Sequence, residues 1–118
     1  MKPKLMLTIA GAYYILDAIA NVVQAGHFDF APYAYSMYGL SFGVLFLLFR
    51  NEAASKMRDA VFMAGFLSSL GVGLISFYAQ WIGTFWDLPI GYISSILWFI
   101  VAAGFFLVGR ANMAAQSK

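Results

Sequence analysis

The strongest constraint in this sequence is a set of four apolar stretches, each long enough to cross a lipid bilayer. A bilayer core about 30 Å thick is crossed by about 20 residues of helix, at a rise of about 1.5 Å per residue. Backbone polar groups in lipid must be satisfied within the segment, and the alternating strands of a membrane barrel are absent, so each stretch is expected to be a helix. The four stretches are residues 5–25, 32–49, 60–81 and 88–109.

The segments between these stretches are short, and only residues 50–59 are strongly charged. Gly26 is expected to end the first helix, and Pro32 and Pro89 suit the first turns of the second and fourth helices, where a missing N–H costs nothing. None of the connecting segments is long enough to hold a domain. The 118 residues therefore predict an all-α fold, a single domain that is an integral membrane four-helix bundle with antiparallel neighbours.

Composition leads to the same class of protein. Apolar residues make up 63% of the chain and charged residues 10%, where a soluble domain has about 25% charged residues. The chain is too rich in apolar and aromatic residues for disorder, and a net charge of +2 is no basic stripe, so nucleic acid is not an expected partner. Because the chain has no cysteine, disulfides, thiolate metal sites and cysteine nucleophiles are excluded.

Every lysine and arginine falls on one side of the four expected helices. By the positive-inside rule this side is cytoplasmic, so both termini are expected there, and we expect the protein in a bacterial inner membrane. The opposite side carries His27, Asp29 and Asp87. The basic residues are Lys2, Lys4, Arg50, Lys56, Arg58, Arg110 and Lys118.

Tyrosine and tryptophan gather toward the outer face. An interfacial belt explains such residues, but a simple belt has members at both interfaces. The alternative is a pocket with aromatic walls in the outer leaflet. The residues are Tyr33, Tyr35, Tyr38, Tyr78, Trp81, Trp86 and Tyr92.

Asp17 is the only charged residue well inside any of the four stretches. An aspartate at the centre of a membrane helix costs roughly 2.5–3.5 kcal/mol, which makes it a candidate functional residue. Tyr13, Asn21 and Gln24 share its helical face by their spacing, and Tyr14 flanks that face. The face should therefore point at the bundle interior or a partner. The carboxyl group would either exchange a proton or, as a neutral acid bonded to Tyr or Asn, set the helix register.

Small residues recur at helical spacing in the other stretches. Gly39 and Gly43 form a GxxxG pattern, which allows close helix approach in lipid. A further stripe in the third stretch predicts a close helix seam, or alternatively a solvated path. If that stripe faces the Asp17 face, their polar residues meet in the outer half of the bundle. The stripe consists of Gly65, Ser69, Gly73, Ser76 and Gln80.

These patterns define a candidate ligand-binding site in the outer half. Its expected residues are Asp17, Asn21, Gln24, Tyr13, Tyr14, Ser76, Gln80, Tyr38, Tyr78 and Trp98. No catalytic residue, metal site or cofactor is expected, because the nucleotide, hydrolase and metalloprotease motifs are absent and the chain has one histidine. His27 with Asp29 would supply too few ligands for an ordinary metal site.

The layout is similar to that of the small multidrug-resistance transporters, which have about this length, four spans and one acid in the first span. The resemblance rests on the position of Asp17 and on the stretch Tyr78-Ala79-Gln80-Trp81. It implies that Asp17 binds protons and cationic drugs in turn. The family's acid is Glu in a motif absent here, and its dual topology needs a weaker charge bias. The layout also looks like that of DoxX-like four-helix bacterial proteins, without a diagnostic motif, and neither family is assigned.

The expected function is non-catalytic binding of a hydrophobic small molecule or a partner subunit through the outer-half site. The alternatives are a small proton-coupled transporter that uses Asp17, and an intramembrane enzyme with Asp17 as general acid and His27 as the only obvious second titratable group. Expected partners are membrane lipids and further subunits, either copies of the same chain or members of a larger membrane complex.

Overall fold

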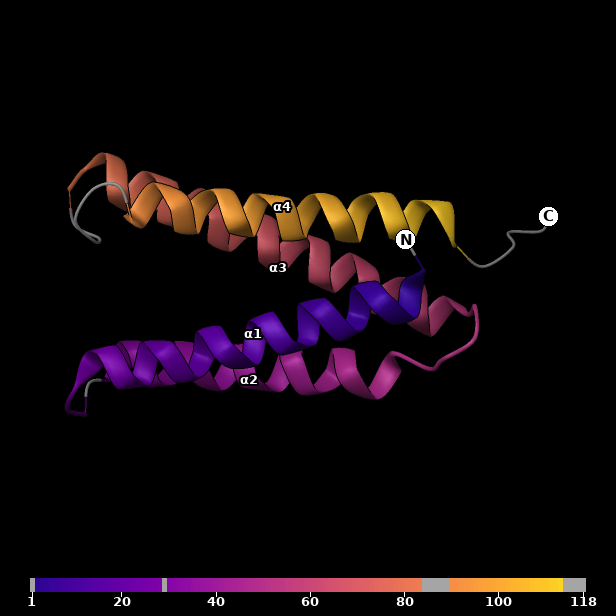
Figure 1. Cartoon of the computed structure of the whole chain (residues 1–118), viewed down its shortest axis with the longest axis horizontal. Coiled ribbons are helices and arrows are strands. Elements are labelled where there is room, and N and C mark those ends of the chain that lie inside the picture. Colours follow the sequence, from indigo (N-terminus) through magenta and orange to yellow (C-terminus); the bar gives the residue numbers. More distant parts are fainter. Residues whose placement is uncertain (1, 29, 84–89, 114–118) are drawn as a thin grey trace. The chain divides into compact units, whose positions relative to one another are not determined.

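The regular structure of this chain consists of four long helices. The computed structural model describes residues 2–28, 30–83 and 90–113. Each helix is long and apolar enough to cross a membrane by length and composition, which confirms the prediction of an all-α chain with four such helices. In chain order the helices are α1 (Pro3–Ala25), α2 (Phe30–Phe49), α3 (Lys56–Trp81) and α4 (Ile90–Ala111) (Figure 1). The residues Asp29, Trp86, Asp87, Pro89 and Lys118, used in the sequence analysis, lie outside the described residues.

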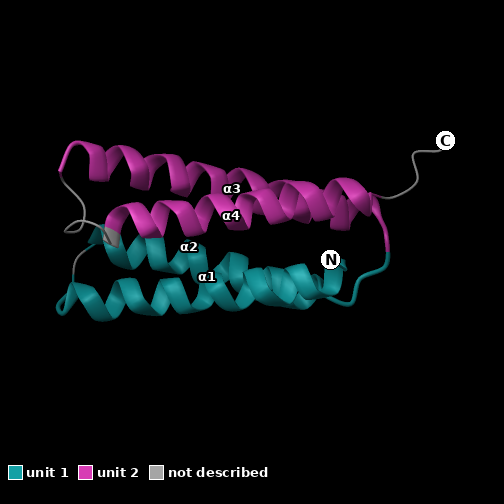
Figure 2. Ribbon diagram, turned by 45° about the horizontal axis from the view of Figure 1, so that its top comes forward, with its two compact units in different colours: residues 1–53 teal, residues 54–118 magenta. Residues whose placement is uncertain are grey.

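The chain divides into two compact units, residues 1–53 and 54–118 (Figure 2). Helix α1 packs against α2 in the first unit, and α3 packs against α4 in the second. Each unit is an antiparallel helical hairpin. In the first, Gly11 lies opposite Gly43, whereas the later Ala18 lies opposite the earlier Gly39. In the second, Gly65 lies opposite Phe105, whereas the later Gly73 lies opposite the earlier Phe99. The single four-helix domain expected from the sequence stays a prediction.

The ends of α1 follow from local sequence. Pro3 opens the helix at a position where no backbone N–H is required. Gly26 closes it with a φ of 73°, a left-handed conformation that glycine adopts without a Cβ penalty. The first helix therefore begins at a proline and ends at a glycine, the residue types that favour a helix start and a left-handed helix end.

Helix α3 begins before its apolar stretch. The Ser55 side chain caps the helix by accepting a hydrogen bond of 3.1 Å from the backbone N–H of Arg58. Asp59 lies in the first turn, where a negative charge is favourable next to the helix dipole. Arg58 donates to the carbonyl oxygen of Asn112 at 2.7 Å and so connects the start of α3 to the end of α4. This turn is helical because of its cap and charges, whereas the sequence analysis placed it in the connecting loop.

The two helices of the first hairpin approach each other most closely at Gly11 and Gly43. A Cβ on Gly43 would lie 2.9 Å from the carbonyl oxygen of Gly11, and a Cβ on Gly11 would lie 3.0 Å from that of Gly43. The first distance is shorter than real Cβ atoms show, and the second is at that limit. Gly39, the other member of the GxxxG pattern, is less confined, since its Cβ would make ordinary contact with Ala18 at 3.5 Å. The closest contact therefore pairs one glycine from each helix.

Aromatic side chains pack beside this glycine contact. Tyr14 and Phe46 are buried, and their rings meet edge to face with centroids 4.9 Å apart. Phe42 adds a second edge contact to Tyr14 at 6.4 Å. Tyr14 thus belongs to the packed core between α1 and α2. Its place in the sequence, three residues before Asp17, is equally consistent with core packing and with ligand binding.

In the second hairpin, each close approach sets a glycine against a side chain. A Cβ on Gly73 would lie 2.8 Å from the Phe99 ring, and a Cβ on Gly65 would lie 2.7 Å from Cδ1 of Phe105. Ser69, between these glycines on α3, is fully buried. The stripe of small residues on α3 therefore receives the rings of α4.

Candidate functional site

Asp17 lies half-buried on α1 and accepts hydrogen bonds from both helices of the first hairpin. The amide nitrogen of Asn21 donates to its Oδ2 at 3.2 Å, and the hydroxyl of Tyr35 on α2 donates to the same oxygen at 3.3 Å. The same amide also donates to the backbone carbonyl of Asp17 at 2.8 Å. We call Asp17, Asn21 and Tyr35 the carboxylate cluster.

Helical spacing accounts for the part of the cluster on α1. Asn21 follows Asp17 by four residues, which is one helical turn, so its side chain lies beside the carboxylate. Tyr13 precedes Asp17 by four residues, is half-buried, and lies within electrostatic range of the carboxyl group. These neighbours follow from sequence alone, because residues of one helix four apart always share a face.

Tyr35 is the member of the cluster that sequence reasoning missed. It was expected only as one of several aromatic residues near the outer face, and nothing in its local sequence distinguishes it from Tyr33 or Tyr38. Its contact with Asp17 depends on the register between α1 and α2, which the glycine contact of Gly11 with Gly43 helps to set. The sequence could have indicated Tyr35 only if the GxxxG pattern of α2 had first been used to align the two helices, because that alignment shows which tyrosine lies at the same depth as Asp17.

Two other expected residues of the first hairpin are exposed. Gln24 is exposed on α1, three residues after Asn21, and Tyr38 is 71% exposed on α2. Neither contributes to the carboxylate cluster, although Gln24 shares the face of Asp17 by spacing. Exposure of a tyrosine is favourable near a membrane interface, where its ring and hydroxyl meet different surroundings.

The remaining expected site residues belong to the second hairpin. Ser76, Gln80 and Trp98 are buried in it, whereas Tyr78 is exposed. The carboxylate cluster lies wholly within the first hairpin. Whether Ser76 and Gln80 meet Asp17, as the sequence analysis expects, stays a prediction.

Gln80 occupies a confined place at the end of α3. It is 6% exposed, and a Cβ on Gly91 of α4 would overlap its side-chain carbonyl. Its Oε1 has no hydrogen-bond partner among the residues that the structure describes. Glycine at position 91 therefore makes room for the Gln80 amide between the two helices.

No metal centre is formed by the part of the chain that the structure describes. Groups of three or more His, Asp and Glu side chains suited to a metal ion are absent from it. His27 is exposed in the turn between α1 and α2. The carboxylate cluster is accordingly a site of one acid, one amide and one phenol.

The chain matches no family model, no curated protein and no solved structure. The chemistry of the carboxylate cluster follows from its atoms. Oδ2 of Asp17 already accepts two hydrogen bonds, while Oδ1 accepts none from the residues that the structure describes. This half-buried oxygen can accept a hydrogen bond from a ligand or attract a cation.

Proposed function

We propose that this chain is an integral membrane protein with both termini on the cytoplasmic side. In each hairpin the described basic residues lie at the open end, away from the turn that joins its two helices. If the helices cross a bilayer, the short segment from Arg50 to Ser55 keeps both open ends on one side, and the positive-inside rule makes that side cytoplasmic. These residues are Lys2, Lys4, Arg50, Lys56, Arg58 and Arg110.

Cysteine labelling tests this orientation, since the chain has no cysteine of its own. Ala54→Cys places a thiol in the segment between the hairpins, and His27→Cys places one in the turn of the first hairpin. A membrane-impermeant maleimide added to intact cells should label the variant at position 27, and should label position 54 only after the membrane is opened. Labelling of position 54 in intact cells would reverse the orientation.

The function that the geometry supports best is binding of a hydrophobic ligand that carries a hydrogen-bond donor or a positive charge. The single observation behind it is the half-buried Asp17 carboxylate, held in place through Oδ2 by Tyr35 and Asn21 while Oδ1 remains available within the described residues. A charge in this position is costly without a partner, and a cationic group on an apolar ligand would lower that cost.

Ethidium is a suitable probe because it is an apolar aromatic cation with amine donors and its fluorescence rises on binding. Asp17→Asn keeps the shape of the side chain and removes its charge, and it should weaken ethidium binding by about tenfold, the effect of losing one charge-assisted hydrogen bond. Glu52→Gln, which makes the same chemical change at an exposed residue between the two hairpins, is the matched control and should leave binding unchanged. Equal affinity of the wild-type and Asp17→Asn proteins would overturn the proposal.

Proton-coupled transport is the second candidate, favoured by one further observation. Asp17 is the only Asp, Glu, Lys or Arg inside the four apolar stretches, so it is the only group there that can alternate between a charged and a neutral form near the ligand. A transporter would accumulate ethidium in liposomes only when a proton gradient is imposed. Asp17→Asn should abolish that accumulation, and binding without gradient-driven uptake would restrict the function to binding.

A further inference from the structure

The second hairpin carries a cavity, and none of its lining residues belongs to the carboxylate cluster. It has a volume of about 510 Å³, within the range of about 300–1,000 Å³ found for ligand pockets. All nine residues that line it belong to α3, α4 and the residues just after α4, and we call it the α3–α4 groove. The lining residues are Asp59, Phe62, Met63, Phe66, Phe105, Phe106, Gly109, Arg110 and Met113.

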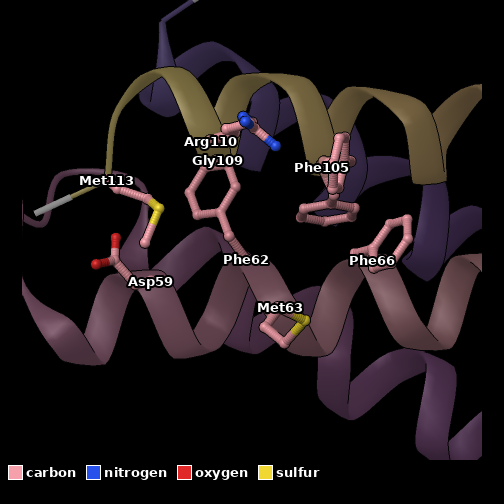
Figure 3. A pocket seen from close by; sticks show the side chains of 9 residues that line it. Asp59, Phe62, Met63, Phe66, Phe105, Gly109, Arg110 and Met113 are labelled. Carbon is pink, nitrogen blue, oxygen red and sulfur yellow. The ribbon is translucent and has the colours of Figure 1, made fainter.

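The groove has a buried aromatic floor and an exposed apolar rim. Phe62 and Phe105 are buried and meet edge to face with centroids 5.7 Å apart. Figure 3 shows the Phe62 ring reaching from α3 toward Gly109 on α4, where a Cβ would lie 3.1 Å from that ring. Along the rim, the side chains of Met63, Phe106 and Met113 are each about half exposed, at 56%, 45% and 52%.

The polar residues of the groove are at one end. Arg110, in the last turn of α4, is exposed and forms no hydrogen bond or ion pair with the residues that the structure describes. Phe66 and Phe105 lie further along the helices, away from the charged end (Figure 3). Residues 59 and 66 are about 10 Å apart along α3, at a rise of about 1.5 Å per residue. The groove therefore runs parallel to the helix axes, from a charged end to an apolar end.

The two charged residues that line the groove, Arg110 and Asp59, have opposite signs, and the positive excess at this end comes from residues next to the groove. Lys56 and Arg58 begin α3 at the same end of the hairpin as Arg110, and Asp59 is the single acid among these residues. Basic pockets between membrane helices on the cytoplasmic side attract anionic lipid headgroups. An apolar groove that ends at exposed arginine thus matches an amphiphile with an anionic head and an acyl chain.

We infer that the α3–α4 groove binds a membrane phospholipid with an anionic headgroup. An acyl chain lies over Phe62 and Phe105, between the Met63 and Phe106 side chains, and the phosphate contacts Arg110. The acyl chain of this lipid would run in the same direction as the acyl chain of any bilayer lipid beside a membrane helix. The headgroup would lie at the end of the helix, and the acyl chain would lie along it. The inference rests on the proposed membrane insertion and orientation of the chain, and it does not depend on ligand binding by Asp17.

Native mass spectrometry of the full chain, released from bilayers of equal phosphatidylglycerol and phosphatidylethanolamine, tests this inference. The wild-type protein should retain phosphatidylglycerol preferentially. Arg110→Gln should lower that preference by about fivefold, the effect of one basic side chain on an anionic headgroup. Arg50→Gln is the matched control, because it removes the same charge from an exposed residue outside the groove, and it should preserve the preference.

A second variant tests the acyl-chain contact. Phe106→Ala removes an exposed ring from the rim and should reduce retention of both lipids together, without changing the preference for the anionic headgroup. Three outcomes would overturn the inference. The first is that the wild-type protein shows no preference for phosphatidylglycerol. The second is that Arg50→Gln lowers the preference as much as Arg110→Gln does. The third is that Phe106→Ala converts an oligomer into a monomer while lipid retention is unchanged. The last result would assign the groove to a second copy of the chain.

Discussion

The two hairpins bring their helices together in different ways. In α1 and α2, Gly11 and Gly43 each face the backbone carbonyl of the other, and the side chains of Leu47 and Ile15 also pack against them. In α3 and α4 the glycines at close approaches meet side chains, as Gly73 meets the Phe99 ring, whereas Gly71 has nothing within 4 Å. Without a hydrophobic driving force between helices in lipid, van der Waals contact decides association, and both arrangements increase it. The comparison teaches that a small-residue pattern predicts a close contact but not what fills the space.

The hairpins also differ in where their polar side chains form hydrogen bonds. In the first, the bond from Tyr35 to Asp17 joins two helices. In the second, the Ser95 hydroxyl donates within its own helix, to the Gly91 carbonyl at 3.1 Å. A bond within one helix satisfies the hydroxyl and leaves the register between helices undetermined. The second hairpin also has a bond between its two elements, from Arg58 to the Asn112 carbonyl at 2.7 Å, but it lies at the start of α3, whereas the bond from Tyr35 lies inside the paired helices of the first hairpin.

The largest expected effect breaks the backbone contact of the first hairpin. Gly43→Ala adds a Cβ that meets the Gly11 carbonyl, which cannot move aside without displacing the helix, so the free energy of unfolding should fall by about 1–3 kcal/mol. Gly39→Ala on the same helix meets only ordinary contacts and should change stability little. Thermal unfolding in detergent measures both, and equal effects would show that the close approach at Gly43 is not decisive.

Hydrogen exchange on the same variants separates the two hairpins. Gly43→Ala should accelerate exchange in peptides from residues 1–53 more than in peptides from residues 54–118, since the two units form separate sets of contacts. Equal acceleration in both regions would show that the two hairpins unfold as one cooperative unit.

A smaller effect is expected from the matched change in the second hairpin. Gly73→Ala meets the Phe99 ring, which is half-buried and can shift, so the loss should be about 1 kcal/mol, at the low end of the range for overpacking. Phe99→Leu in the same chain should recover part of that loss by making room. Gly71→Ala, where nothing lies within 4 Å, is the control. A loss as large as that of Gly43→Ala would contradict the distinction between ring and backbone contacts.

The smallest effect concerns the polar bond of the first hairpin. Tyr35→Phe removes the hydroxyl and should lower stability by about 0.6 kcal/mol, the average for such bonds between membrane helices. Combining Tyr35→Phe with Asp17→Leu in a double-mutant cycle isolates the coupling between the two residues. Tyr38→Phe should be neutral. No measurable coupling would mean that Tyr35 does not help to hold Asp17.

Much of the helical organisation follows from sequence because it depends on local chemistry. Four apolar stretches predicted four helices, and the observed bounds of α1, α2 and α4 differ from those stretches by two residues or fewer at each end. Helix α3 begins four residues earlier than its stretch, at Lys56 instead of residue 60. The reason is that Ser55 caps a turn outside the apolar region, and hydropathy carries no information about caps.

The candidate site was predictable only in the part that one helix contributes. Asn21 lies beside Asp17 because a spacing of four residues determines their shared face. Gln24 shares that face as well, but it is exposed, because a face extends along a helix whether or not another helix covers it. Tyr35 could not be selected among the tyrosines of α2, since its contact requires the register between two helices.

The sequence by itself determined the number of helices in the described residues, their apolar character and the placement of every basic residue outside the four apolar stretches, because these properties depend on residue type and on distance along the chain. Only the tertiary structure decided that Gly43 meets Gly11, that Tyr35 reaches Asp17, and that the rings of α3 and α4 leave a groove ending at Arg110. The physical reason is that each of these features joins residues on different helices, and the relative sliding and rotation of two apolar helices depend on how their side chains pack together.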